Sequence, residues 1–134
     1  MSVVQLFLQD KIIINDKEYG RMDFSKIAAD NKCQIKDHPF DQTLKSIEIT
    51  NVTINTAECG LVMIEAADGK IMNVVLYLRG PIAPWLAACS CCAKGSPDIY
   101  ETPYGKFADY IFDDFHKITV IMKDNCLIYL WDCN

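Results

Sequence analysis

The sequence lacks every short motif that would name an enzymatic activity. None of its 134 residues form a G-x-S-x-G turn, a G-x-x-x-x-G-K-[ST] phosphate loop, an H-E-x-x-H helix or an EF-hand loop. Internal repeats, low-complexity tracts and linker-like stretches are also missing. We therefore expect one domain over residues 1–134, and its 51% apolar content is enough for a substantial core without a disulfide or metal.

Long apolar runs are missing too. No stretch approaches the roughly 20 residues that cross a bilayer, and the N-terminal "MSVVQLFLQDKIII" has neither a basic start nor a small-residue cleavage site. The seven cysteines are an odd number, which suits reduced thiols better than a disulfide framework. We expect a protein of the cytoplasm that does not contact membranes.

Positive charge is scarce. Thirteen Lys and Arg face eighteen Asp and Glu, for a net charge of −5, and this disfavours nucleic acid as a ligand because phosphate binding needs clustered bases. The excess of acidic residues is concentrated between residues 98 and 114. This segment has one base, Lys106, and five acids: Asp98, Glu101, Asp109, Asp113 and Asp114. A partner that meets this segment is expected to be basic. The sequence does not set the oligomeric state.

Three cysteines fall within four positions in "WLAACSCCAKGSP". On a helix, Cys89 and Cys92 share a face with Trp85 and Leu86 while Cys91 points elsewhere, so the three thiols do not converge on a tetrahedral ion. The Cys-x-x-Cys spacing lies near the end of the expected helix, where the helix dipole raises a thiol pKa instead of lowering it. We expect packing, with no metal and no cofactor.

Two other groupings leave chemistry open. In the expected last hairpin His116 faces Cys133, a pair that could activate a nucleophile but has no third orienting group. On a helix Asp109 and Asp113 would share a face and could contact one divalent ion, with a solvated surface or a protein-binding surface as the alternatives. His38, in "KDHPFD", is expected to be a solvated loop residue.

The first half of the chain predicts strands with one short helix. "VVQLFLQDKIIIN" reads as strands Val3–Leu8 and Lys11–Asn15 joined at Gln9 and Asp10. "DFSKIAADN" predicts a two-turn helix capped by Asp23 or Ser25, and residues 31–43 a loop. "LKSIEITNVTI" then alternates as a strand with one wetter face.

The strongest turn signal is Asp68-Gly69, between two apolar arms. It predicts a two-residue type I′ hairpin that pairs Ala67 with Lys70 and, further along, Ile64 with Asn73. Both faces of the arms are apolar near the middle. We therefore expect this hairpin in the centre of the sheet, covered on much of both sides.

The second half predicts two helices and a final hairpin. One helix begins at Pro84 and ends before Gly95-Ser96-Pro97. Another has Thr102 as cap and Pro103 in its first turn. Its core stripe at helical spacing comprises Tyr104, Phe107, Ala108, Ile111, Phe112 and Phe115. A hairpin about Asp124-Asn125 then pairs Lys117 with Asp132, Ile118 with Trp131, Val120 with Tyr129 and Met122 with Leu127.

Together these elements predict an α+β fold. The expected architecture is a twisted antiparallel sheet of about seven strands, with two or three helices packed mainly on one face.

The acidic segment "PYGKFADYIFDDFH" with Asp98 and Glu101 before it gives the chain the overall character of a known class. It resembles the cytosolic immunity proteins of bacterial toxin–immunity pairs, including contact-dependent growth inhibition systems. The resemblance implies binding to a toxin domain, often a basic nuclease, and occlusion of its active site. The expected binding residues are Asp98, Glu101, Asp109, Tyr110, Asp113 and Asp114, with Tyr110 as the aromatic anchor.

Two other functions stay open from the sequence. A small enzyme or small-molecule-binding domain would need a pocket, expected between the helices and the sheet. A subunit of a larger assembly would expose a sheet edge or an apolar patch.

Overall fold

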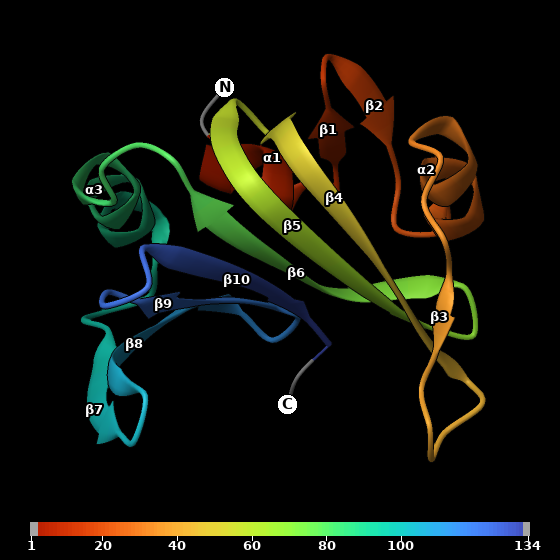
Figure 1. The fold of residues 1–134 in the computed structure, drawn as a ribbon. Helices are drawn as coiled ribbons and strands as arrows, with labels where there is room; N and C mark the ends of the chain where they lie inside the picture. The colour runs from red at the N-terminus through yellow and green to blue at the C-terminus, as the bar shows by residue number, and fades with distance from the viewer. Residues whose placement is uncertain (1–2, 133–134) are drawn as a thin grey trace.

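The computed structural model describes residues 3–132 as three short helices and a ten-stranded antiparallel sheet (Figure 1). The helices are α1 (Val3–Leu8), α2 (Phe24–Asp30) and α3 (Ala83–Cys92). The strands are β1 (Ile12–Ile14), β2 (Lys17–Tyr19), β3 (Lys36–Asp37), β4 (Leu44–Ile54), β5 (Ala57–Ala67), β6 (Lys70–Leu78), β7 (Asp98–Thr102), β8 (Gly105–Asp113), β9 (His116–Ile121) and β10 (Cys126–Trp131). The α+β class is as expected, but the sheet has ten strands instead of about seven.

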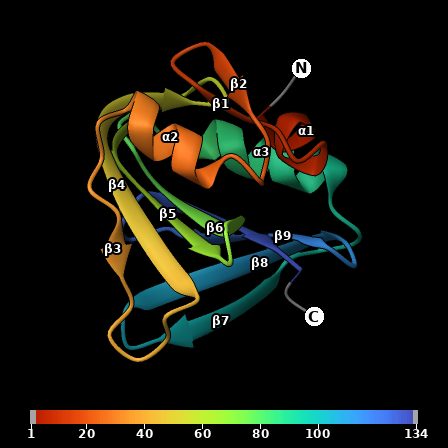
Figure 2. The same cartoon turned by 90° about the vertical axis from the view of Figure 1, so that its right-hand side faces the viewer.

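The sheet is open, with the order β2-β1-β4-β5-β6-β10-β9-β8-β7, and β3 pairs beside β4. The last strand, β10, lies between β6 and β9 and so joins the two halves of the sheet. Figure 2 shows the three helices grouped together above the middle strands. No helix in the described part of the chain is both long and apolar enough to cross a membrane.

The core lies between the helices and one face of the sheet. Along β8 the buried residues alternate with more exposed ones, and the other long strands follow the same rule because strand side chains point to the two faces in turn. Phe7 of α1 is buried between two aromatic rings, stacked on Tyr129 at 4.6 Å and tilted against Trp131 at 4.9 Å between centroids. Arg21 covers the Trp131 ring at 5.1 Å.

The N-terminal segment is a helix, not the first strand of a hairpin. Val3, Val4 and Phe7 are all buried, and their i, i+1, i+4 spacing gives one helical face. The β-branched valines favour a strand by intrinsic propensity, but packing of Phe7 into the aromatic pocket outweighs that small preference. Lys11–Asn15 is a strand as expected, with bounds Ile12–Ile14.

The largest correction concerns residues 98–113, where a helix was expected from Thr102 onward. This segment is the hairpin β7–β8, closed by Pro103 and Tyr104. Thr102 and Pro103 are also favourable for a β-turn, with Pro at its second position, and the Thr102 hydroxyl accepts a hydrogen bond from Tyr104 N–H at 3.0 Å. The expected core stripe is wrong, because Tyr104 and Phe115 are exposed and Ala108, Tyr110 and Phe112 are the buried row.

The Asp68-Gly69 hairpin is confirmed at its turn and corrected beyond it. Ala67 pairs with Lys70, and positive φ at both turn residues (51° and 82°) is the type I′ requirement. The register then shifts, so that Ile64 faces Val74 instead of Asn73. The bulge lets Ile71 and Val74, three residues apart, both face the core.

The C-terminal hairpin exists with a longer loop than expected. Leu130 faces Lys117, Tyr129 faces Ile118 and Leu127 faces Val120, a shift of two residues from the expected register. Asp132 does not pair with Lys117, because its carboxylate contacts Arg21 at 2.9 Å and Lys70 at 3.4 Å. The expected loop at residues 31–43 also contains the short strand β3.

Candidate protein-binding face

The side of the sheet that points away from the helices carries a broad apolar surface. We call it the open face, because no described helix or strand packs on it (Figure 2). Its apolar side chains come from six strands and are half-buried or exposed: Leu61, Met63, Val75, Tyr77, Tyr100, Phe107, Ile111, Ile121, Ile128 and Leu130. The sequence predicted a cover on both sides of the central hairpin, and this expectation is wrong for the open face.

Strand register orders these side chains into rows across the sheet. One row crosses seven strands through directly paired residues, in the order Glu48, Met63, Val75, Ile128, Thr119, Asp109 and Asp98. Strands about 4.8 Å apart make this row roughly 29 Å long. It has a carboxylate at one end, two carboxylates at the other and apolar side chains near its centre.

A parallel row is almost wholly apolar. It runs through paired residues in the order Leu61, Tyr77, Cys126, Ile121, Phe107 and Tyr100. The Cys126 thiol is fully buried within this row, and burial raises its pKa to about 12. The two rows together form an apolar strip bordered by acids, an arrangement suited to a partner rather than to bulk water.

The acids at the β7–β8 end are fixed by hydrogen bonds. Asp109 accepts a hydrogen bond from the Thr119 hydroxyl at 2.7 Å and another from the Tyr100 hydroxyl at 3.2 Å. Partial burial of the phenol, and then the Asp109 carboxylate beside it, raises the pKa of Tyr100. The nearest base is Lys117, with its Nζ 3.9 Å from Asp109 Oδ2. These contacts hold the carboxylate in place and leave Asp98 beside it exposed.

At the other end the open face is slightly hollowed. A cavity of about 170 Å³ lies over β4, β5 and β6, and its lining includes Glu48, Met63, Glu65, Asn73 and Val75. Within this lining, the Asn73 side-chain amide donates a hydrogen bond to Glu65 Oε1, with 3.2 Å between nitrogen and oxygen.

The structure does not bring all the predicted binding residues to one surface. Asp98 and Asp109 form a direct cross-strand pair on the open face. Glu101 lies on the other side of β7, with its Oε1 3.9 Å from Lys106 Nζ. Tyr110 faces the core and is only 5% exposed, so it is not an exposed anchor.

The remaining two, Asp113 and Asp114, lie where β8 turns into β9. Four residues of strand place the Cα atoms of Asp109 and Asp113 about 13 Å apart. They do not share the helical face that the expectation of a divalent-ion site required. The described residues contain no cluster of three or more His, Cys, Asp or Glu that could hold a metal ion.

His116 is engaged by two carboxylates instead of a cysteine. Its Nδ1 lies 2.8 Å from Asp113 Oδ1 and its Nε2 lies 2.7 Å from Asp10 Oδ1. Asp10 Oδ1 also accepts a hydrogen bond from Trp131 Nε1 at 2.9 Å. Both ring nitrogens therefore have a carboxylate oxygen within hydrogen-bond distance.

The expected partner of His116, Cys133, lies outside the described residues, and the residue that faces His116 across the hairpin is Trp131. Phe7 packs against the imidazole edge to face, at 5.2 Å between centroids. His116 therefore ties the α1–β1 turn to the β8–β9 turn. His38 is exposed, as expected.

The cysteines of α3 point as the helical spacing predicted. Cys89 is fully buried, Cys92 is half-buried against the core and Cys91 is exposed. Burial, with a smaller contribution from Cys92, raises the pKa of Cys89 to about 12. The packing interpretation is confirmed for Cys89.

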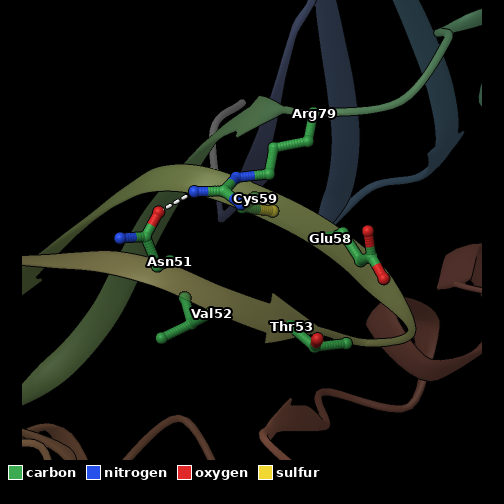
Figure 3. A pocket seen from close by; sticks show the side chains of 6 residues that line it. All are labelled: Asn51, Val52, Thr53, Glu58, Cys59 and Arg79. Carbon is green, nitrogen blue, oxygen red and sulfur yellow. Dashed lines mark hydrogen bonds between the residues drawn. The ribbon is translucent and has the colours of Figure 1, made fainter.

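Figure 3 shows a second hollow, where β4 and β5 are both irregular. Asn51 has a φ of 53° and falls between the paired residues Thr50 and Val52, opposite Gly60. Arg79 extends over Gly60 and donates a hydrogen bond to the Asn51 side-chain oxygen. The hollow has a volume of about 200 Å³, and Glu58 also lines it. The guanidinium is already occupied by the Asn51 amide.

Comparisons of the chain with protein-family models, with curated proteins and with solved structures found no match.

Proposed function

We propose that this protein is a non-catalytic inhibitor that binds a basic partner protein through the open face. The observation that supports this best is the row from Glu48 to Asp98, in which apolar side chains lie between carboxylates at both ends. An apolar centre with a charged rim is the usual anatomy of a protein interface. The length of the row, roughly 29 Å, suits an interface that buries about 800 Å² on each partner.

The nature of the partner follows from the charges at the two ends of the row. Two bases, Lys36 and Lys117, lie beside the four acids Glu48, Glu65, Asp98 and Asp109. A basic surface would be attracted to this face and would associate faster at low salt. By class resemblance we assign the protein to the immunity proteins of bacterial toxin–immunity pairs, acting in the cytoplasm on a nuclease-type toxin domain.

The alternative of a small-molecule site has less support. The cavities over Asn51, over Met63 and beside Phe24 have volumes of about 200, 170 and 280 Å³. Ligand pockets are typically about 300–1,000 Å³ and enclosed by apolar walls. All three hollows are smaller than this range.

The test is capture of the partner from the source organism, followed by titration of the purified partner against variants. Met63→Lys places a charge in the apolar centre, and Glu48→Lys reverses the acid at one end. Each is expected to weaken binding by about tenfold, or 1.4 kcal/mol. The matched control is Glu18→Lys on β2, the same charge reversal at the far end of the sheet, which is expected to bind as the original protein does.

Urea unfolding of each variant checks that the fold is intact, because Glu48 is exposed and surface charges contribute little to stability. If the captured protein is acidic, or if both variants bind it unchanged, the proposed function is wrong.

A further inference from the structure

One edge of the sheet is unprotected. In the described chain β7 is the terminal strand next to β8, and Asp98, Ile99, Tyr100 and Glu101 are all exposed. The Ile99 side chain is 58% exposed and that of Tyr100 is 41% exposed, and they lie on opposite faces of the strand. A strand with apolar side chains open on both faces is unusual at an edge that has no neighbour.

The hairpin geometry determines which backbone groups are free. Only Pro103 and Tyr104 separate the paired residues Thr102 and Gly105, so this closing pair exchanges hydrogen bonds. Hydrogen-bonded and non-hydrogen-bonded pairs alternate along an antiparallel ladder. The N–H and C=O groups of Ile99 and Glu101 therefore point away from β8, toward the free edge.

The opposite edge of the sheet is built differently. β2 has only three residues, and Lys17 near its edge is held by Asp30 of α2 at 2.6 Å. Short length and an edge lysine are features that prevent strand pairing. β7 has five residues, and neither a lysine nor a proline occurs within it.

The charges of β7 indicate what kind of strand fits. Its two charged side chains, Asp98 and Glu101, are acidic, and Asp109 lies directly across from Asp98. Opposite charges in facing positions stabilise a strand pair, and like charges destabilise it. A second copy of this chain would bring the same acids together, whereas a basic strand would pair with them.

We propose that β7 accepts an extended basic segment of the partner, which adds to the sheet as a further strand beside it. Main-chain hydrogen bonds to Ile99 and Glu101 would give affinity, and Asp98 and Glu101 would select lysine or arginine. The added strand would extend the open face by one position. This inference rests on the proposed function, since it names how the same partner is held.

The test uses the full chain labelled with ¹⁵N and three synthetic peptides that need no knowledge of the partner. The basic probe is a seven-residue peptide that alternates lysine pairs with valine pairs, so that lysines lie on both faces of the added strand, as Asp98 and Glu101 lie on both faces of β7. The acidic probe replaces lysine by glutamate, and the third is the basic probe N-methylated on alternate residues. Only the first is expected to bind and to slow hydrogen exchange at the Ile99 and Glu101 amides. Its affinity should fall when salt is raised.

Two variants separate the backbone from the side chain. Ile99→Pro removes an outward N–H that β8 does not use, and is expected to weaken binding of the basic probe by about tenfold. Ile99→Ala keeps the N–H and is expected to retain most of the affinity. Unfolding curves verify that both variants fold.

Three outcomes would overturn the inference. The methylated probe could bind as tightly as the basic probe. The basic probe could slow hydrogen exchange only at amides outside β7. The free protein could self-associate through Tyr100. If the captured partner is sensitive to Met63→Lys but not to Ile99→Pro, the proposed function holds and strand addition at β7 is wrong. If it is sensitive to neither, the proposed function itself fails.

Discussion

At the scale of single residues, His116 connects two separate turns of the chain. Its side chain is 10% exposed, and it links Asp10 to Asp113 while packing on Phe7. His116→Phe keeps an aromatic ring against Phe7 and removes both hydrogen bonds. Because both carboxylates are about half exposed, we expect the free energy of unfolding at pH 7 to fall by only about 1 kcal/mol. Urea denaturation measures it.

The difference in unfolding free energy between this variant and the original protein should depend on pH. Burial raises the pKa of Asp113, but hydrogen bonds from Phe115 N–H and His116 outweigh it, and the net pKa lies below 3.8. The ionised Asp113 carboxylate therefore stabilises the fold above pH 3.8. This stabilisation is lost as the pH falls through the lowered pKa. The gap should therefore shrink below about pH 4, and a gap that stays constant to pH 2 would contradict the assignment of these contacts.

Asp132 offers a second prediction of the same kind. The hydrogen bond from Arg21 holds the pKa of Asp132 below 3.8, with the charges of Arg21 and Lys70 adding to it. Asp132→Asn should lower the free energy of unfolding at pH 7 and make it vary less between pH 4 and pH 2. Unfolding curves measured at several pH values test this. Asp114→Asn makes the same change at an exposed turn residue and is the control, expected to alter the free energy of unfolding at pH 7 only slightly.

At the scale of elements, the β5–β6 turn depends on one glycine. Gly69 has a φ of 82° and no atom within 4 Å of where a Cβ would be, so Gly69→Ala adds backbone strain without a clash. We expect a loss of about 1 kcal/mol in the free energy of unfolding. Gly80→Ala is the matched control, because Gly80 is equally open and has no positive φ. Equal losses at both positions would show that φ at Gly69 is not the cause.

The same turn shows how far the sequence predicts this fold. Asp68-Gly69 specifies a local conformation, so it predicted the hairpin and its first residue pair. The bulge beyond it depends on Ile71 and Val74 both reaching a core formed by distant residues, and no local signal predicts that. Strands β4, β5 and β6 were therefore predicted, but the full register between them was not.

The helix prediction for residues 104–115 was wrong for a different reason. Phe107, Ala108, Ile111 and Phe112 fit a helical period, and Ala108, Tyr110 and Phe112 fit a strand period. Aromatic and β-branched residues favour strands, and the Pro103 turn permits a hairpin. The predicted binding site was partly wrong for the same reason. Asp98 and Asp109 do lie on one surface, but Tyr110 is buried in the core. The apolar centre of the open face was not predicted.

At the scale of the whole molecule, β10 holds the sheet together. It pairs with β6 on one side and β9 on the other, and it contributes Leu127, Tyr129 and Trp131 to the core. A chain that ends at residue 122 lacks this strand and should show no cooperative unfolding transition by circular dichroism. Adding a synthetic peptide of residues 123–134 is the control and should restore the transition. A truncated chain that unfolds with an unchanged midpoint would contradict this role of β10.

The central position of β10 also matters while the chain is being made. Residues are added at roughly 5–20 per second, so the stretch of about 50 residues between the end of β6 and the end of β10 takes on the order of 3–10 s to synthesise. Throughout that time β6, with apolar residues on both faces, has no neighbour on one edge. We expect nascent chains to recruit chaperones at this stage, and ribosome pausing after residue 78 to lower the soluble yield.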